Sequence, residues 1–422
     1  MIRNEIGGSL ELPGSKSILN RLLIISTYLH DKLSLTRFSQ CDDIKTLVSA
    51  LKQIGLKTTH KKDTTNLLFE QNAESKGKIN NVFIKDSATG FRLLLARLAG
   101  FPGVKTNITI SSQLKKRPIK PLIDALKTIG AHIIEKNEHY QIIGTQFEGG
   151  ELNISANISS QFLSALLLIT PSYKKDLKIN LKGKIVSSGY LDMTIEIMKT
   201  FGIKVIKTKR SIFVPAGQYY KNPKIFKVEP DFSSASYFFA LGAFSLNGIC
   251  IKFDKKKSLQ PDFSFLKFLE LMGAKIEFRN SFICVKKRKL HGLSQDMSSY
   301  PDLVPTIAIL ALFADSPTSL RGLGHLKYKE SNRLLNLKKE LAKLGCEVKA
   351  ECDSLKIYPL QNPHKNIKME TYDDHRLVMS FGIINLLIDG EIIREEQKRF
   401  VNKSFPEFFK ILQSVVSSQK NS

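Results

Sequence analysis

Tryptophan is absent from the 422-residue chain, and cysteine is scarce. The five cysteines are scattered, with no Cys-x-x-Cys pair: Cys41, Cys250, Cys284, Cys346 and Cys352. An odd number without a metal-ligand spacing argues against a structural zinc site and against a disulfide framework. We therefore expect reduced cysteines in a reducing compartment.

Long apolar runs and targeting patterns are also missing. One of the longest apolar stretches, residues 303–313, is too short to span a bilayer. The first residues lack the basic-then-apolar order of a signal peptide. We expect a cytoplasmic protein that does not bind membranes.

Acidic residues are outnumbered, since 64 Lys and Arg face 39 Asp and Glu for a net charge of +25. This excess favours anionic partners, either nucleic acid, anionic membranes or acidic metabolites. The lysines are spread along the chain and form no basic tail. A length of 422 residues with 42% hydrophobic residues indicates a globular protein of two domains.

What the chain does contain is an internal repeat of 71 to 75 residues. A helical pattern ends at a glycine and is followed by two short alternating strands. The five glycines are Gly55, Gly130, Gly202, Gly273 and Gly345. A further helix at 405–412 lacks following strands, so we expect the strand-like residues 9–12 to complete that sixth repeat.

A second helix start recurs at the same period. Each start is a polar, capping-type cluster before a long apolar run: Ser17, Thr89, Ser160, Ser234, Thr306 and His375. Helices that are apolar all round are buried helices. Six repeats therefore predict an α/β (α+β) protein with two domains of three repeats, whose buried helices are parallel and direct positive N-termini to one side.

The first helix start, residues 12–23, has the features of an anion site. Pro13 and Gly14 end the preceding segment, and Ser15 is a capping side chain. Lys16 and Arg21 add charges to a helix N-terminus that already attracts anions. A capped surface helix that carries two cations by chance is the alternative reading of this segment alone.

The motifs resemble the 5-enolpyruvylshikimate-3-phosphate synthase family over nearly the whole chain. They occur in the family's order: Leu12-Pro13-Gly14-Ser15-Lys16-Ser17 with Asn20-Arg21, Lys116-Arg117-Pro118-Ile119, Ser159-Ser160-Gln161-Phe162-Leu163, Ser187 with Tyr190 and Asp192, Ser233-Ser234-Ala235-Ser236-Tyr237, Pro301-Asp302, Lys329-Glu330-Ser331-Asn332-Arg333-Leu334, Asp374-His375-Arg376 and Lys403-Ser404-Phe405-Pro406.

The resemblance implies two domains, each of three βαβαββ units, which agrees with the repeat. One domain would be 14–229, mainly binding shikimate 3-phosphate. The other would be discontinuous, 1–13 plus 230–422, with the catalytic carboxylates and the phosphoenolpyruvate-binding cations. The implied reaction moves the enolpyruvyl group of phosphoenolpyruvate to the 5-hydroxyl of shikimate 3-phosphate and releases phosphate. The family needs no cofactor and is usually monomeric.

Carried over position by position, the resemblance implies two substrate-binding sets. Shikimate 3-phosphate would contact Lys16, Ser17, Arg21, Ser159, Ser160, Gln161, Ser187, Asp302, His325 and Lys329. Phosphoenolpyruvate would contact Lys16, Ala88, Arg117, Gln161, Arg333, Arg376 and Lys403. Both substrates carry phosphate and carboxylate groups, for which Arg forks and Lys point charges are suited.

Proton transfers need acid–base groups, and Asp302, Glu330 and Lys16 are the matching candidates. We expect Asp302 to act as the base toward the 5-hydroxyl, with Glu330 or Lys16 serving the methylene carbon. From the residues alone, Asp302 could equally be a helix cap, and Glu330 with Arg333 an ordinary surface pair. Asp373, Asp374 and His375 could suggest a metal site, but Arg376 adjoins them and other ligands are lacking.

Three positions depart from the family's common pattern. Ala88 stands where a glycine is usual, His325 where many members have Asn, and Ser188-Gly189 where Lys-Pro is usual. The Ala88 methyl should crowd phosphoenolpyruvate's pocket and reduce sensitivity to the longer inhibitor glyphosate. His325 could still donate to the substrate.

Three other interpretations fit the sequence less well. The sister UDP-N-acetylglucosamine 1-carboxyvinyltransferases typically carry a reactive Cys in the region that here reads 111–117, which has none. A nucleic-acid-binding repeat protein would need aromatic stacking platforms, whereas the aromatics are mostly Phe in apolar runs. A purely structural repeat protein would not need so many polar helix starts.

Overall fold

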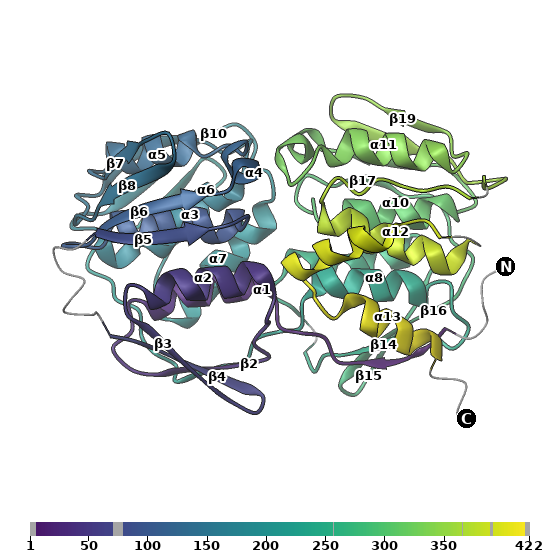
Figure 1. Ribbon diagram of the computed structural model, residues 1–422, viewed down its shortest axis with the longest axis horizontal. Coiled ribbons are helices and arrows are strands. Elements are labelled where there is room, and N and C mark those ends of the chain that lie inside the picture. Colours follow the sequence, from purple (N-terminus) through teal and green to yellow (C-terminus); the bar gives the residue numbers. More distant parts are fainter. Residues whose placement is uncertain (1–5, 71–78, 256, 365, 389–390, 418–422) are drawn as a thin grey trace. The chain divides into compact units, whose positions relative to one another are not determined.

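A computed structural model describes residues 6–70, 79–255, 257–364, 366–388 and 391–417. The chain divides into two compact units (Figure 1). Unit 1 comprises Met1–Pro13 and Pro230–Ser422, and unit 2 comprises Gly14–Glu229. In the described part, no helix combines the length and apolar character that a membrane crossing requires.

Unit 2 contains three four-stranded sheets in its described residues. Their strand orders are β13-β2-β4-β3, β5-β6-β8-β7 and β11-β12-β10-β9. The strands are β2 (Leu33–Thr36), β3 (Leu56–Lys61), β4 (Thr64–Phe69), β5 (Ile79–Ile84), β6 (Lys105–Ile110), β7 (His132–Glu135), β8 (His139–Ile143), β9 (Gly150–Ser155), β10 (Leu177–Lys182), β11 (Ile206–Lys207), β12 (Ser211–Val214) and β13 (Ile225–Phe226). In each sheet one parallel pair adjoins antiparallel strands, which is the pattern of a βαβαββ repeat.

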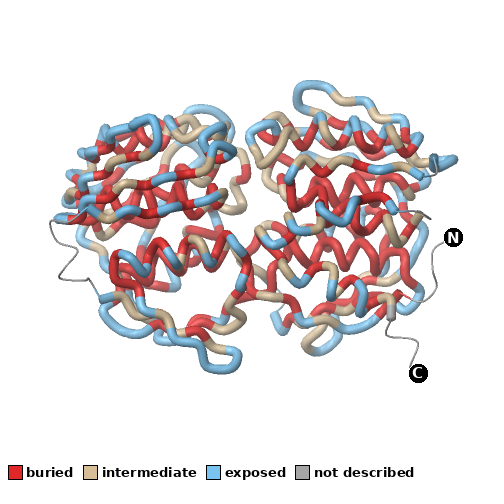
Figure 2. Tube along the Cα trace, in the orientation of Figure 1, coloured by how far each residue is buried: buried red, intermediate tan, exposed pale blue. Residues whose placement is uncertain are grey.

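The helices of unit 2 fall into two kinds. The buried ones, α1 (Lys16–Ser26), α3 (Ala88–Ala99) and α6 (Ser160–Leu168), contact one another and are inaccessible along most of their length. The others are α2 (Asp42–Lys52), α4 (Ser112–Lys115), α5 (Lys120–Thr128), α7 (Ser188–Thr200) and the 3₁₀ helix η2 (Thr170–Ser172). Figure 2 shows the buried segments as the interior of the unit.

Unit 1 contains two four-stranded sheets in its described residues, ordered β1-β14-β16-β15 and β17-β18-β20-β19. The strands are β1 (Gly8–Leu10), β14 (Ile249–Lys252), β15 (Lys275–Arg279), β16 (Phe282–Lys286), β17 (Ser294–Asp296), β18 (Thr318–Arg321), β19 (Val348–Ala350) and β20 (Ser354–Ile357). Its third repeat consists of helices, without an assigned strand among the described residues.

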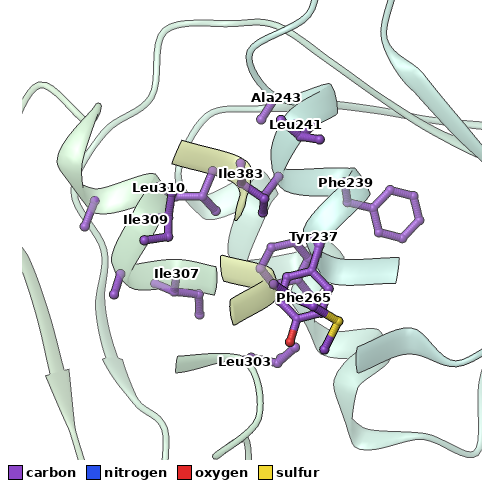
Figure 3. Packing of buried hydrophobic residues seen from close by; sticks show 14 of the residues in the cluster. Tyr237, Phe239, Leu241, Ala243, Phe265, Leu303, Ile307, Ile309, Leu310 and Ile383 are labelled. Atoms are coloured by element: carbon purple, nitrogen blue, oxygen red, sulfur yellow. The ribbon is translucent and has the colours of Figure 1, made fainter. Parts of the chain in front are cut away.

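The core of unit 1 is formed by α8 (Phe232–Gly242), α10 (Val304–Leu312) and α12 (His375–Leu387). Figure 3 shows Phe239, Ile309 and Ile383 from these three helices among the buried side chains. Burying one such aliphatic or aromatic side chain stabilises the fold by roughly 1.5–3 kcal/mol. Around this core lie α9 (Phe265–Leu271), α11 (Arg333–Lys343), α13 (Phe408–Ser417) and the 3₁₀ helices η3 (Pro261–Ser264), η4 (Gly324–Tyr328) and η5 (Glu395–Lys403).

The repeat glycines end helices as the sequence predicts. The φ angles of the five glycines are all positive, from 82° to 121°: Gly55, Gly130, Gly202, Gly273 and Gly345. Residues with a Cβ atom are sterically strained at such angles, so glycine is favoured there. The predicted buried helix starts are confirmed as well, because α1, α3, α6, α8, α10 and α12 begin within two residues of the six marked positions.

The predicted place of the N-terminal strand is wrong. β1 pairs in parallel with β14, Gly8 opposite Ile249, and so completes the repeat that contains α8 and α9 rather than the sixth repeat. The partner could not be read from the sequence, because strand pairing depends on which apolar face each segment buries in three dimensions.

The expectation of no disulfide is also wrong. Cys250 on β14 lies opposite Cys284 on β16 in the antiparallel register, with a Cα–Cα distance of 4.0 Å, and the two form a disulfide. Their separation of 34 residues matches no recognised motif. Cys41, Cys346 and Cys352 are free thiols.

Candidate active site

Several candidate residues of unit 2 lie at the N-termini of its buried helices, while Arg117 lies between α4 and α5 and Ser187 directly precedes α7. Gly14 leads into α1, and a Cβ there would lie 1.8 Å from the Arg37 carbonyl oxygen, so only glycine fits. Ser15 then caps α1 by accepting a hydrogen bond from the Ile18 N–H. This entry fixes Lys16 and Ser17 on the first turn of the helix.

Lys16 forms an ion pair that the sequence did not suggest. Its Nζ lies 2.7 Å from Asp43 Oδ2, and the two side chains are only 12% and 6% exposed. Asp43 belongs to α2, and its carbonyl accepts a hydrogen bond from the Ser87 hydroxyl, beside Ala88 at the start of α3. Asp43 therefore contacts both Lys16, through its carboxylate, and the residue before α3, through its carbonyl.

Arg21 is a buried cation without a carboxylate in hydrogen-bond or ion-pair range among the described residues. Its guanidinium donates to the Thr194 hydroxyl at 2.7 Å, to the Ser17 carbonyl at 2.6 Å and to the Tyr190 carbonyl at 3.0 Å. Burial lowers the pKa of Arg21 to about 10, so it remains charged at neutral pH. A buried charge surrounded by neutral oxygens is costly, and an anion would offset that cost.

Tyr190 and Ser187 connect this cluster to α7. Ser187 has a φ of 54°, an uncommon angle for a residue other than glycine, and its carbonyl accepts from the Tyr190 N–H. The Ser187 side chain is buried. This turn brings the 187–190 segment onto Arg21, and the structure therefore joins Ser17, Arg21 and Ser187 in one region of unit 2.

Gln161 lies at the start of α6, where the Ser159 hydroxyl accepts from its N–H. Its side-chain amide donates to the Thr89 hydroxyl at 2.9 Å and accepts from Arg92 at 2.5 Å. The N-termini of α3 and α6 are thus in direct contact. Ser160, next in the motif, is buried.

Arg92 is a supporting residue that the sequence left unassigned. Besides Gln161, its guanidinium donates to the Pro118 carbonyl at 2.7 Å, directly after Arg117. Arg92 is buried and its charge stacks on the Phe162 ring, 5.2 Å from the centroid. It therefore holds Gln161 and the Arg117 loop in one arrangement.

In unit 1, Arg333 is at the centre of a network of carboxylates. Its side chain is 1% exposed. Nη1 lies 2.9 Å from Asp302, Nη2 lies 2.7 Å from Glu330, and Nε lies 2.8 Å from Asp374. Burial opposes the charged form, but these three carboxylates hold the pKa of Arg333 above its usual value.

Asp302 joins the starts of α10 and α12. One of its oxygens accepts from Arg333 and the other from Arg376 Nη2, both at 2.9 Å. Burial alone would raise its pKa, but the charges of Arg376, Arg333 and Lys329 hold the pKa of this carboxyl well below its usual range. Asp302 is therefore ionised at neutral pH, and each of its carboxylate oxygens accepts a hydrogen bond from one of the two arginines.

His325 and Lys329 lie in and directly after η4, within electrostatic range of Asp302. His325 is buried, and its only hydrogen-bond interaction among the described residues is a weak one with the Gly322 backbone. Burial first, and then the Lys329 charge, lower the pKa of His325 to about 3, so the imidazole is neutral at pH 7. A buried neutral imidazole of this kind can form hydrogen bonds with a hydroxyl or carboxylate group of a ligand.

Lys403 is the last residue of η5, which packs on α12, and it is half-buried. Asp374 directly precedes α12 and caps the helix by accepting from the Arg376 N–H at 2.9 Å. Among the described residues, no group of three or more His, Cys, Asp or Glu side chains is arranged so that it could hold a metal ion.

Comparisons with known proteins agree with these motifs over the whole chain. The family model described as EPSP synthase (3-phosphoshikimate 1-carboxyvinyltransferase) matches residues 2–412. The chain belongs to the EPSP synthase family.

Relatives in this family are similar along their entire length. The 3-phosphoshikimate 1-carboxyvinyltransferase of Photobacterium damsela subsp. piscicida is 38% identical over 420 residues, covering 98% of this chain and 97% of the relative. The one from Buchnera aphidicola subsp. Cinara cedri is 36% identical over 418 residues, with 97% and 95% covered. The solved EPSP synthase of Acinetobacter baumannii shares the two-domain α/β fold, with a TM-score of 0.79 at 22% identity and 97% and 96% coverage.

Four residues that contact the candidate site residues lie outside the predicted set. They are the acids Asp43 and Asp374, the supporting Arg92 and Tyr237, whose hydroxyl lies 3.5 Å from Arg376 Nη1. Asp374 had a visible signal, since an acid directly before a helix start is a capping residue. The partners of the other three depend on tertiary contacts.

Proposed function

We propose that this chain transfers the enolpyruvyl group of phosphoenolpyruvate to the 5-hydroxyl of shikimate 3-phosphate, giving 5-enolpyruvylshikimate 3-phosphate and phosphate. One observation carries the proposal. Several of the family's motif residues lie at the N-termini of buried helices in each unit, where cations and helix dipoles suit substrates rich in phosphate and carboxylate.

The reaction is an addition followed by an elimination. In the addition, the 5-hydroxyl oxygen bonds to C2 of phosphoenolpyruvate, its proton passes to a base, and a proton is added to the C3 methylene. In the elimination, a proton leaves the new methyl group, the C2–C3 double bond re-forms, and phosphate leaves from C2. Each proton step requires a positioned acid or base.

Asp302 is the proposed base toward the 5-hydroxyl. In the structure its proton affinity is suppressed by Arg333 and Arg376. Binding of the phosphoenolpyruvate anion to these arginines would offset their charges and thereby raise the basicity of Asp302. Glu330 and Lys16 are the proposed proton carriers at the methylene carbon.

Arg333 and Arg376, with Lys403 and Arg117, are proposed to bind phosphoenolpyruvate. Guanidinium forks match its carboxylate and phosphate. Both arginines are buried and already hydrogen-bonded to carboxylates, so their donors are preset in direction. Lys16 and Gln161 are proposed to contact both substrates, and Ala88 to contact phosphoenolpyruvate.

Shikimate 3-phosphate is proposed to bind mainly through residues of unit 2, with contributions from Asp302, His325 and Lys329. Arg21 supplies a buried charge with neutral partners, and Ser17, Ser159, Ser160 and Ser187 supply hydroxyls. The neutral His325 would donate to a substrate oxygen. We also propose that the enzyme works as a cytoplasmic monomer.

The test is phosphate release by the purified chain supplied with phosphoenolpyruvate and shikimate 3-phosphate, with the product identified by mass spectrometry. We expect phosphate and enolpyruvylshikimate 3-phosphate in equal amounts, only when both substrates are present. UDP-N-acetylglucosamine should not replace shikimate 3-phosphate. Phosphate release from phosphoenolpyruvate when UDP-N-acetylglucosamine replaces shikimate 3-phosphate, or when neither of these two acceptors is present, would reject the proposal.

A further inference from the structure

The segment that precedes α12 has an unusual backbone. Tyr372 and Asp373 are consecutive and have φ angles of 53° and 55°. For residues other than glycine, each such angle costs about 1 kcal/mol or more, and it persists where surrounding contacts enforce it. Asp374 follows directly, and its N–H closes a turn on the Thr371 carbonyl at 2.9 Å.

Glu340 on α11 supplies contacts that enforce this turn. Its side chain is fully buried. One carboxylate oxygen accepts from the Tyr372 hydroxyl, and the other accepts from the Glu370 N–H at 2.9 Å. Lys343 lies one turn further along α11 and pairs with Glu340 at 2.5 Å, which balances the buried charge.

The same helix holds the other end of the turn. Arg333, in the first turn of α11, donates to both oxygens of Asp374, at 2.8 and 3.2 Å. Glu340 follows Arg333 by seven residues, which is two helical turns and therefore the same face of α11. Residues on one face of α11 thus bind the 370–374 segment at two points, about 10 Å apart along the helix axis.

We propose that Tyr372 and Glu340 are positioning residues. They orient the two arginines that are proposed to bind phosphoenolpyruvate, Arg333 and Arg376. The Glu340–Tyr372 contact fixes the two left-handed residues, and these place Asp374. Asp374 then orients Arg333 through two hydrogen bonds and Arg376 through the cap on its N–H. The inference rests on the proposed function, which assigns these arginines to phosphoenolpyruvate.

The primary variant is Tyr372→Phe, which removes one hydroxyl and leaves the ring in place. We expect the KM for phosphoenolpyruvate to rise about five- to tenfold, less than the full value of one hydrogen bond to a charged group, because the hydroxyl acts on the arginines only through Asp374. The KM for shikimate 3-phosphate should stay within about twofold, because unit 2 provides most of that binding. Glu340→Gln should shift the same constant in the same direction.

The double variant and a matched control separate positioning from general loosening. Tyr372→Phe/Glu340→Gln should raise the KM for phosphoenolpyruvate little more than the larger single change, because both remove one contact. Tyr140→Phe removes an equivalent hydroxyl, which donates to Glu135 at 3.2 Å in unit 2, and should leave this KM unchanged.

A second readout does not depend on turnover. Amide hydrogen exchange of residues 374–378 should be at least about fivefold faster in Tyr372→Phe than in the wild type, since the Asp374 cap loosens. Unchanged exchange and an unchanged KM for phosphoenolpyruvate in both single variants would overturn the inference. If the wild type shows no turnover, the proposed function fails, while the exchange result still decides whether the contact places the Asp374 cap.

Discussion

The Asp302 carboxylate accepts a hydrogen bond from Arg376 Nη2 at 2.9 Å. Its other oxygen accepts from Arg333, so one carboxylate is shared by two buried arginines, of which Arg333 also pairs with Glu330 and Asp374. The proposed base and the proposed anion-binding cations are therefore electrostatically coupled. An anion that binds the arginines changes the proton affinity of Asp302, and a change at Asp302 alters how strongly the arginines attract anions.

The first prediction concerns this coupling. Asp302→Asn should lower thermal stability, because it leaves Arg333 and Arg376 with less compensating charge, at a cost of about 3 kcal/mol or more. Millimolar inorganic phosphate should raise the melting temperature of Asp302→Asn more than that of the wild type, since phosphate can replace the lost carboxylate. Differential scanning fluorimetry with chloride as the control anion measures both. Equal phosphate shifts in the two proteins would count against the coupling.

Arg21 gives the second prediction. Arg21→Lys keeps the charge but loses the fork that reaches Thr194 and the Tyr190 carbonyl together. We expect the KM for shikimate 3-phosphate to rise about tenfold or more, with the KM for phosphoenolpyruvate nearly unchanged.

A matched control for Arg21 is available in the same unit. Arg97 is also buried, bonds the Thr27 hydroxyl at 2.6 Å, and stacks on Tyr28 and Phe101. Arg97→Lys should lower stability without changing the KM for shikimate 3-phosphate. If both variants raise this constant equally, the effect is loosened packing and Arg21 does not bind shikimate 3-phosphate directly.

His325 gives a pH-dependent prediction. The pKa of its imidazole is about 3 in the fold, against 6.5 for an ordinary histidine, because burial disfavours the charged form. Between these values the unfolded chain binds the proton and the folded chain does not, so stability is lost as pH falls from 6.5 toward 3. The contribution is at most roughly 1.4 kcal/mol per pH unit.

Urea unfolding at pH 7 and pH 4.5 measures this contribution. The wild type should lose more stability between the two conditions than His325→Asn does, while the exposed His132→Asn should behave as the wild type. Identical losses for His325→Asn and the wild type would show that His325 is protonated in the fold near its ordinary pKa.

Ala88 gives a prediction about inhibition. It is the first residue of α3 and is buried, and the family resemblance places a glycine there in many members. Ala88→Gly should lower the glyphosate inhibition constant by about tenfold, the steric value of one crowded methyl group, and should change the KM for phosphoenolpyruvate less. An inhibition constant typical of sensitive members, unchanged by Ala88→Gly, would refute this.

Most of the fold could be predicted from the repeat, because the residues that start and end its helices act locally. Gly130, for example, ends α5 with a positive φ, and the capping side chain of Ser159 starts α6. Neither position needs knowledge of distant contacts. The pairing of β1 with β14 and the Cys250–Cys284 disulfide do need it, and both were mispredicted.

The candidate site also has a part that could be predicted from the sequence and a part that could not. Motif positions such as Arg21 and Arg333 follow from the family resemblance, and the structure shows that both are buried. Their immediate partners did not follow. Asp374 lies 41 residues from Arg333, and Asp43 lies 27 residues from Lys16, so only the packed units reveal which carboxylate each cation meets.

The central claim is that Lys16 and Asp302 are catalytic residues for enolpyruvyl transfer. Steady-state phosphate release from phosphoenolpyruvate and shikimate 3-phosphate tests it most directly, with Lys16→Ala, Asp302→Ala and the exposed ion-pair variant Lys174→Ala as control. We predict that kcat falls at least about a hundredfold in each of the first two variants, with normal turnover in the control. Normal turnover in both Lys16→Ala and Asp302→Ala would contradict the account.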